Sequence, residues 1–268
     1  MKPLILYHGQ CTDGFGAAYA VWKRLGDKAE YIPMQHGQEP PEVTGREVTF
    51  LDFSFPRPII QAMQRQAKHL TIVDHHITAA EDLQDLENTT FDMNHSGAVL
   101  AWQHFHTTSV PELLLYVEDK DLWNWALPAS KEVSAALSSY PMDFTLWDTL
   151  QIENLKREGV TLLRYQQQLV DQLLTHTSQL HFAGHVLEVI NTPILQSEVA
   201  NRLAQTNTFG LTWFVHEGDA IVSLRSDSDF DVASLAKQYG GGGHIKASGF
   251  RFPIDLNQLF TRAGQQEP

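Results

Sequence analysis

The feature that most constrains the fold is the regular alternation of short apolar segments with amphipathic ones in the first 125 residues. Apolar segments at 4–7, 47–53 and 69–73 are typical of buried strands. The expected helices cover 12–26, 58–68 and 96–105. Strands separated by helices of this length form βαβ units, so the sequence predicts an α/β fold with an open parallel sheet flanked by helices.

The remainder of the chain has a different pattern. From about 127 to 176 the spacing of apolar residues is helical, with a long amphipathic helix at 161–174. One further helix is expected at 232–243, and strands are expected at 185–191, 212–218, 220–226 and 246–252. The sequence therefore predicts a first domain at 1–150, a helical linker at 151–180 and a smaller second α/β domain at 181–268.

The chain carries a formal net charge of −13 at pH 7. Proteins that grip long duplex nucleic acid normally present a basic face, so this charge argues against such a partner. An anionic substrate must instead be held locally, by metal ions and a few placed cations. This favours a small substrate.

The sequence contains no run of about 18 apolar residues, which argues against a membrane partner. The apolar run near the N-terminus is too short for a signal peptide, and the single cysteine, Cys11, has no internal partner for a disulfide. These features fit a cytoplasmic protein. They leave the oligomeric state open, with a homodimer among the options.

Three predicted strands end in side chains of the types that bind metals. The first runs into YHGQCTDG, with His8 and Asp13, the second into FLDFS, with Asp52, and the third into IVDHH, with Asp74, His75 and His76. The carboxyl ends of neighbouring parallel strands share one edge of a sheet, so these groups are expected to meet there. So much negative charge in one place would repel itself, and a pair of divalent cations resolves the conflict.

Carboxylates and imidazoles together suit Mn²⁺, with Mg²⁺, Fe²⁺ or Zn²⁺ as alternatives. Two such ions a few ångströms apart lower the pKa of a bridging water and hold both oxygens of a phosphoryl displacement. Taken singly, each of these residues has an ordinary explanation as a turn former or a helix cap. Three strand ends that carry ligand types together are much harder to explain by chance.

The triplet Asp74-His75-His76, preceded by His8, Asp13 and Asp52, resembles the DHH phosphoesterase superfamily. The resemblance implies hydrolysis of phosphate esters and anhydrides with two divalent metal ions, usually manganese. It also implies that Asp52 bridges the two ions and that His8 serves the first. His76 would contact the scissile phosphate, and Asp74 would orient its neighbours from behind the ligands.

A fourth motif of the superfamily places an aspartate shortly before an aromatic residue, and VEDKDLW (117–123) resembles it. Asp119 is the expected ligand of the second ion, beside Asp13 and His75, and Asp121 is the competing candidate. The first motif departs from the family pattern, because Cys11 stands where the family has its first aspartate. Cys11 is either a soft ligand that favours Zn²⁺ or Fe²⁺, or a small buried residue beside a first ion that binds weakly or is absent.

The segment YGGGGHIKASGF (239–250) carries four consecutive glycines, whose backbone N–H groups can approach an anion closely. Glycines alone are more typical of a flexible turn, but the continuation into His244 resembles the DHHA1 substrate-binding domain associated with this superfamily. The resemblance implies that this loop faces the metal site across an interdomain cleft. The expected substrate-binding residues are Gly241, Gly242, Gly243 and His244, with Arg225 as a phosphate clamp.

Together these features predict a phosphoesterase that hydrolyses short oligonucleotides or nucleotide-derived diesters. The groups expected to stabilise charge on the phosphoryl oxygens are His76, His244 and Arg225. One alternative is a pyrophosphatase or polyphosphatase that uses the same metals. Another is a nucleotide-binding protein whose catalysis is impaired by Cys11. The pair Trp123 and Trp125 is more typical of core packing than of a surface that stacks bases.

Overall fold

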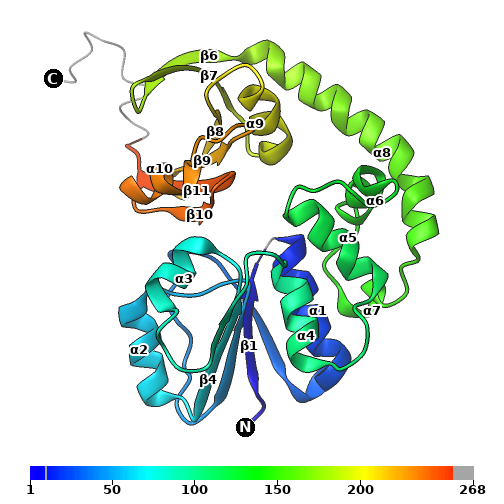
Figure 1. Ribbon diagram of the computed structural model, residues 1–268, viewed down its shortest axis with the longest axis vertical. Coiled ribbons are helices and arrows are strands. Elements are labelled where there is room, and N and C mark those ends of the chain that lie inside the picture. The colour runs from blue at the N-terminus through cyan, green and yellow to red at the C-terminus, as the bar shows by residue number, and fades with distance from the viewer. Residues whose placement is uncertain (10, 256–268) are drawn as a thin grey trace, which may run out of the picture. The chain divides into compact units, whose positions relative to one another are not determined.

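The computed structural model describes residues 1–9 and 11–255, which fall into two compact units. The N-terminal unit covers Met1–Tyr165 and the C-terminal unit begins at Gln166. The dividing point lies inside the longest helix, α8 (Ile152–Leu173), which is drawn in light green in Figure 1.

The N-terminal unit is built on a five-stranded sheet in which every neighbouring pair is parallel, as the alternating pattern predicted. The strand order is β2-β1-β3-β4-β5, so the carboxyl ends of β1, β3 and β4 lie side by side. The strands are β1 (Leu4–His8), β2 (Glu30–Met34), β3 (Glu47–Leu51), β4 (His69–Asp74) and β5 (Thr89–Phe91).

Helices cover both faces of this sheet (Figure 1). One face carries α1 (Thr12–Leu25) and α4 (Gly97–Phe105), and the other carries α2 (Arg57–Gln66) and α3 (Ile77–Leu83). Alternate residues of β1 serve the two layers, since Ile5 packs with the α1 and α4 side and Leu6 with the α2 and α3 side. Three helices extend the first layer, α5 (Glu112–Asp121), α6 (Ser130–Leu137) and α7 (Phe144–Trp147).

Two strands of this sheet, β2 and β5, were not predicted. β2 is an edge strand that contains Pro33 and buries fully only Met34, so it lacks the apolar alternation of a covered strand. β5 is three residues long and lies at the other edge. β3 ends at Leu51, two residues before the predicted end, because Asp52 leaves the extended conformation with φ 53°.

The C-terminal unit contains a six-stranded sheet of order β10-β11-β9-β8-β7-β6, in which only β7 and β8 are paired in parallel. Its strands are β6 (Ser178–Phe182), β7 (His185–Asn191), β8 (Gly210–His216), β9 (Asp219–Arg225), β10 (Gly242–His244) and β11 (Ala247–Pro253). A hairpin turn joins β8 and β9, with Glu217 and Gly218 both at positive φ.

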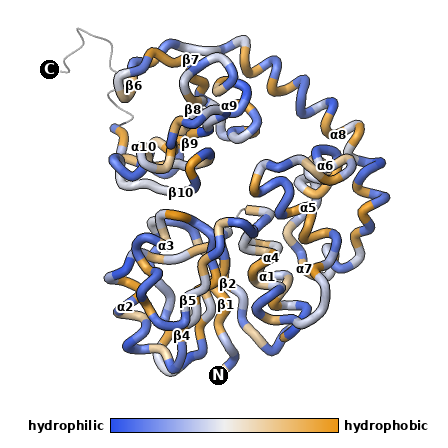
Figure 2. Tube along the Cα trace, viewed as in Figure 1, coloured by the Kyte–Doolittle hydropathy of each residue, from blue (hydrophilic) through white to orange (hydrophobic). Residues whose placement is uncertain are grey.

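Two helices pack on this sheet, α9 (Gln196–Ala204) and α10 (Val232–Gln238). α10 packs in the core of Leu187, Leu211, Leu224 and Phe250, whereas α9 packs with Val170, from the end of α8, and with Ile190. Polar and hydrophobic residues alternate along α8, as expected of an amphipathic helix (Figure 2).

α10 ends five residues earlier than predicted, and the last two glycines of the run belong to β10. Two single-turn 3₁₀ segments complete the described structure, η1 (Gly26–Lys28) and η2 (Leu174–His176). Among residues 1–9 and 11–255, no helix has the length and hydrophobicity needed to cross a lipid bilayer.

Candidate metal centre

Five segments of the N-terminal unit bring ionisable side chains to the carboxyl edge of the sheet. We call this group the carboxylate–histidine cluster, and its members are His8, Asp13, Asp52, Asp74, His75, His76 and Asp121. β1 ends at His8, the residue after β3 is Asp52, and β4 ends at Asp74. Asp13 lies in the first turn of α1, and Asp121 is the last residue of α5.

Asp52 lies at the centre of the cluster. His75 Nε2–H donates a hydrogen bond to Asp52 Oδ1 over 3.1 Å, and His8 Nδ1 lies 3.6 Å from Asp52 Oδ2. His76 Nδ1 is 3.7 Å from Asp52 Oδ1. One oxygen of this carboxylate therefore faces His75 and His76, and the other faces His8.

The backbone around Asp52 is shaped for this position. Asp52 adopts φ 53°, a left-handed conformation that aspartate tolerates better than most residues, and its N–H donates to Val73 O over 3.0 Å. A Cβ on Gly97 would lie 2.5 Å from Asp52 Cβ and 2.8 Å from Asp13 Oδ2. Only glycine at residue 97 lets α4 approach both carboxylates this closely.

Asp13 is fully buried at the start of α4. Its carboxylate accepts hydrogen bonds from Gly97 N–H over 2.6 Å and from Ala98 N–H over 3.0 Å. These N–H groups belong to the first turn of that helix and have no acceptor within it, so they favour a negative charge at this end. Glu118 Oε2 accepts from Ser96 N–H over 2.9 Å, so a second carboxylate fixes the same helix end.

Asp74 organises the histidines that follow it. Its Oδ1 accepts the backbone N–H of His75 over 2.7 Å and that of His76 over 3.2 Å, and it lies 2.8 Å from His76 Nδ1. This contact fixes the orientation of the His76 ring. His75 points the other way, with Nε2 3.6 Å from Asp13 Oδ2.

The fourth motif differs from the sequence-based choice, because Asp121 and not Asp119 lies beside His75. Asp121 Oδ2 is 3.5 Å from His75 Nε2, and within the described residues this buried oxygen has no hydrogen-bond partner. Asp119 instead accepts the backbone N–H groups of Ala126 and Leu127 over 2.9 and 3.1 Å. Its two oxygens therefore hold the loop after α5.

Cys11 lies beside His8 and Asp52, and ligand atoms of these three residues are all within 4.8 Å of one another. His36, which the sequence did not single out, is a further neighbour, since its ring centroid lies 5.8 Å from that of His8. Burial, with repulsion from His8 and His76, lowers the pKa of His36 to about 4. His36 is therefore a neutral imidazole at the rim of the cluster at neutral pH.

The pKa values show how crowded the cluster is. Burial alone would lower the pKa of His75, but the hydrogen bond and charge of Asp52 outweigh it and raise the pKa to about 11. Burial also opposes charge on His8, yet contacts with Asp52 and Cys11 raise its pKa to about 11. Burial raises the pKa of Asp13 well above its usual range, and the charges of Asp121 and Asp52 add to this effect.

The same charges act on the remaining carboxylates. Burial would raise the pKa of Asp52, but hydrogen bonds from His75 and His8 hold it below its usual range. Burial, followed by repulsion from Asp52, raises the pKa of Asp121 despite the opposing charge of His75. Without cations, the raised pKa values of His8 and His75 keep protons on these imidazoles, and the raised pKa values of Asp13 and Asp121 shift these groups toward the neutral acid. A divalent ion supplies the same positive charge, so the donor set and its geometry fit a metal centre.

The predicted residues of the C-terminal unit have different surroundings. Arg225, at the end of β9, donates through Nη2 to Ser197 Oγ over 2.6 Å and through Nη1 to Leu224 O over 2.8 Å. A Cβ on Gly241 would lie 2.0 Å from Gly249 O, so this glycine is required by packing against β11. Gly242, Gly243 and His244 form β10, with Gly243 at φ 134°.

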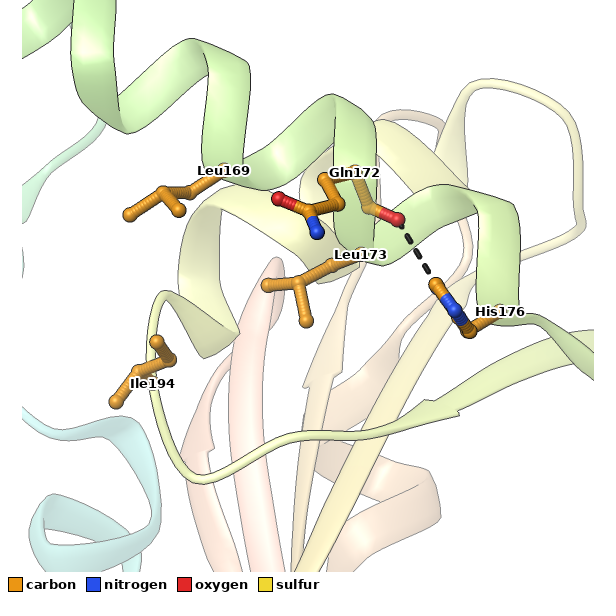
Figure 3. A pocket seen from close by; sticks show the side chains of 5 residues that line it. All are labelled: Leu169, Gln172, Leu173, His176 and Ile194. Carbon is orange, nitrogen blue, oxygen red and sulfur yellow. Dashed lines mark hydrogen bonds between the residues drawn. The ribbon is translucent and has the colours of Figure 1, made fainter.

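A separate pocket lies in the C-terminal unit beside the end of α8 (Figure 3). Its lining consists of Leu169, Gln172, Leu173, His176 and Ile194. His176 Nδ1–H donates to the backbone carbonyl of Gln172 over 3.1 Å, as the dashed line shows. The lining includes none of the predicted site residues, and it is mostly apolar.

The carboxylate–histidine cluster lies at the carboxyl edge of an open parallel α/β sheet, which is where such folds bind their ligands. The DHHA1 domain family matches residues 183–266. An uncharacterized protein of Acanthamoeba polyphaga mimivirus is 28% identical over 282 residues, covering 93% of this chain and 67% of that protein.

One further protein and one solved structure are similar to this chain. Oligoribonuclease NrnB of Bacillus subtilis is 36% identical over 79 residues, which cover 29% of this chain and 20% of that protein. The crystal structure of an exopolyphosphatase-related protein from Bacteroides fragilis is 13% identical with a TM-score of 0.57, and the match covers 96% of this chain and 88% of that one. The DHHA1 match at 183–266 and the similarity to the oligoribonuclease indicate the DHH phosphoesterase superfamily and support a general phosphoesterase function, and the solved structure shares the fold.

Proposed function

We propose that the protein hydrolyses phosphodiester bonds of short oligonucleotides or nucleotide-derived diesters with two divalent metal ions. The observation that carries this proposal is the position of Asp52, whose two oxygens lie among His8, His75 and His76. The ions, when bound, would activate a water and neutralise charge on the phosphoryl group.

The residues of the cluster have distinct proposed roles. Asp52 is the ligand shared by both ions, with His8 and Cys11 on one side. Asp13, His75 and Asp121 serve the other side, where their ligand atoms converge. His76, oriented by Asp74, donates a hydrogen bond to a phosphoryl oxygen and stabilises the charge that develops on it.

The C-terminal unit is proposed to bind the substrate. Arg225 offers a guanidinium for a phosphate, and the segment from Gly241 to His244 offers backbone N–H groups and an imidazole. The proposed division follows the limits predicted from the sequence, with catalysis in 1–150, a linker at 151–180 and substrate binding in 181–268. The match to an oligoribonuclease and the net charge of −13 both favour a short nucleotide substrate over a long duplex.

Mn²⁺ is the proposed native metal, because the cluster mixes carboxylate oxygens with imidazole nitrogens. The position of Cys11 beside His8 and Asp52 fits a soft ligand, which would favour Zn²⁺ or Fe²⁺ at the first site. The rival is that the first ion binds poorly because a thiol replaces the carboxylate, so that catalysis is impaired. We also propose a cytoplasmic location, since the one thiol is placed as a possible ligand and not in a disulfide.

The test is a substrate panel with Mn²⁺ that compares a linear diribonucleotide with pyrophosphate. The proposal predicts release of nucleoside monophosphates at a kcat/KM at least about 100-fold above that of phosphate release from pyrophosphate, the range over which site contacts discriminate substrates. Preferred cleavage of pyrophosphate would indicate that the substrate is a phosphoanhydride and not a phosphodiester. Nucleotide binding without turnover in the wild type, together with a large gain in the Cys11→Asp variant, would favour the impaired protein.

A further inference from the structure

We infer that Trp123 and Trp125, with Lys131, form a platform that stacks a nucleobase of the substrate beside the metal centre. This inference rests on the proposed function and names the part of the substrate that the N-terminal unit recognises. It assigns a binding role to a pair of residues for which the sequence favoured core packing.

The two side chains do not behave as core residues. The Trp123 side chain is 37% exposed and Trp125 is half-buried, whereas Trp102 and Trp147 of the same unit are buried. The rings of Trp123 and Trp125 lie 4.8 Å apart between centroids at an interplanar angle of 75°. The pair therefore forms an aromatic corner that is open to solvent, and aromatic surfaces of this kind stack bases regardless of sequence.

The backbone that carries the pair is held in an unfavourable conformation. Trp123 has φ 58° and Trp125 has φ 53°, in the left-handed region that bulky residues avoid. Asp119 fixes this loop through both its side-chain carboxylate and its backbone carbonyl. Its carboxylate accepts from Ala126 and Leu127 N–H, and its carbonyl accepts from the Asn124 and Trp125 N–H groups. A strained loop that is fixed this thoroughly is rigid before the ligand arrives, which lowers the entropic cost of binding.

The loop begins at the metal centre. Asp121 Oδ2 lies 3.5 Å from His75 Nε2, and Trp123 follows two residues later. Two residues of chain span at most about 7 Å, so the backbone of Trp123 lies close to a proposed metal ligand. We take this backbone separation to be short enough for one nucleotide to reach from the platform to the cluster.

A cation completes the platform. Lys131 Nζ lies 5.6 Å from the centroid of the Trp125 ring, within the range of a cation–π contact. In a chain of net charge −13, this ammonium group supplies local positive charge beside an aromatic surface. Aromatic stacking combined with a nearby cation is the usual chemistry for binding single-stranded nucleic acid without base specificity.

The first test compares Trp123→Ala with the wild type on a linear diribonucleotide and on the same diester with abasic sugars. The inference predicts a KM about tenfold higher for the diribonucleotide, a kcat within about twofold, and no change for the abasic diester. Trp123→Phe should recover most of the loss, because phenylalanine retains a ring. Tyr165→Ala is the matched control, since it removes an exposed aromatic side chain from α8. Equal KM values for Trp123→Ala and the wild type would overturn the inference.

A second measurement separates this inference from the proposed function. Quenching of tryptophan fluorescence by adenosine 5′-monophosphate is recorded in Asp52→Asn, which is expected to be inactive, and in Asp52→Asn combined with Trp123→Ala. The platform predicts that the nucleotide concentration needed for half-maximal quenching is about tenfold higher in the double variant. If the wild type cleaves no diester while this quenching pattern holds, the platform stands and the proposed function fails. If quenching is equal in both variants, the platform fails whatever the activity.

Discussion

The two units of the protein differ in how deeply they bury ionisable side chains. In the N-terminal unit, Asp13, Asp52, Asp74, His75 and Asp119 are each at most 5% exposed. In the described part of the C-terminal unit, no Asp, Glu, His, Lys or Arg side chain is buried to this extent, and the buried polar residues there are serines and threonines. Both sheets have apolar cores, so hydrophobic packing does not explain the difference.

This contrast locates the charges that a cation would compensate. Burying a charge is costly unless it is paired, and the cluster of the N-terminal unit gathers four carboxylates, three of them buried, around only three imidazoles. In the C-terminal unit, Arg225 is partly exposed and donates to a serine hydroxyl and a backbone carbonyl. The buried carboxylates and imidazoles that a divalent ion would pair therefore lie in the first unit.

The largest expected effect is at the centre of the buried cluster. Asp52→Asn should lower kcat/KM by about 10³-fold or more, equivalent to about 4 kcal/mol of transition-state stabilisation. Asparagine tolerates the left-handed backbone of residue 52, so the fold should survive, as circular dichroism can verify. Asp85→Asn removes an exposed carboxylate that pairs with Arg57 and should leave activity unchanged. Retention of a tenth of the activity by Asp52→Asn would rule out the shared-ligand role.

A second comparison separates two aspartates that are two residues apart. Asp121→Asn should weaken Mn²⁺ binding by at least about 10–100-fold, the range seen when even a partner of a ligand is lost. Asp119→Asn should instead lower the free energy of unfolding by about 1–3 kcal/mol, because one partly buried loop N–H loses its charged acceptor. Calorimetric titration and urea unfolding measure the two effects. If Asp119→Asn loses metal and Asp121→Asn does not, the sequence-based choice of ligand would be restored.

The pH dependence of metal binding gives a third test. The pKa of His8 and that of His75 are each raised to about 11, so both imidazoles hold a proton at pH 7 when no ion is bound. Metal ligation requires neutral imidazole, so binding releases protons and the affinity rises with pH. We expect about a tenfold gain in affinity per pH unit between pH 6 and 8 for each proton released. An affinity that is independent of pH over this range would contradict the protonated state of the cluster.

The smallest effect is expected in the C-terminal unit. Arg225→Ala should raise KM by about tenfold with kcat and metal content unchanged, because a phosphate loses one charged hydrogen-bond donor. Arg251→Ala is the matched control, since this arginine lies on the adjacent strand and pairs with Asp219. Equal KM values for the two variants would remove Arg225 from substrate binding.

Sequence periodicity predicted the strands that are covered on both faces and not the strands at the edge. β1, β3 and β4 read as apolar runs because their side chains are buried between two helical layers. β2 was not predicted because it is half-exposed and interrupted by Pro33. Its recognition would have placed His36, two residues after the strand ends, at the same edge as His8.

The limits of the site prediction have a geometric cause. The choice between Asp119 and Asp121 depends on which residue ends α5 and which side chain turns into the loop, and spacing to an aromatic residue fixes neither. Glu118 was missed for a similar reason, since its contact with Ser96 joins segments 22 residues apart. The positive φ of Asp52 is also a tertiary feature, imposed where Gly97 of α4 lies against it.

Equilibrium dialysis of the wild-type protein against Mn²⁺ tests the central claim most directly. If buried carboxylates and imidazoles are gathered to hold cations, saturation should reach two ions per chain, and Asp52→Asn should lose both from the high-affinity range. Fewer than one ion per chain at saturating Mn²⁺, or equal binding by Asp52→Asn, would contradict the account.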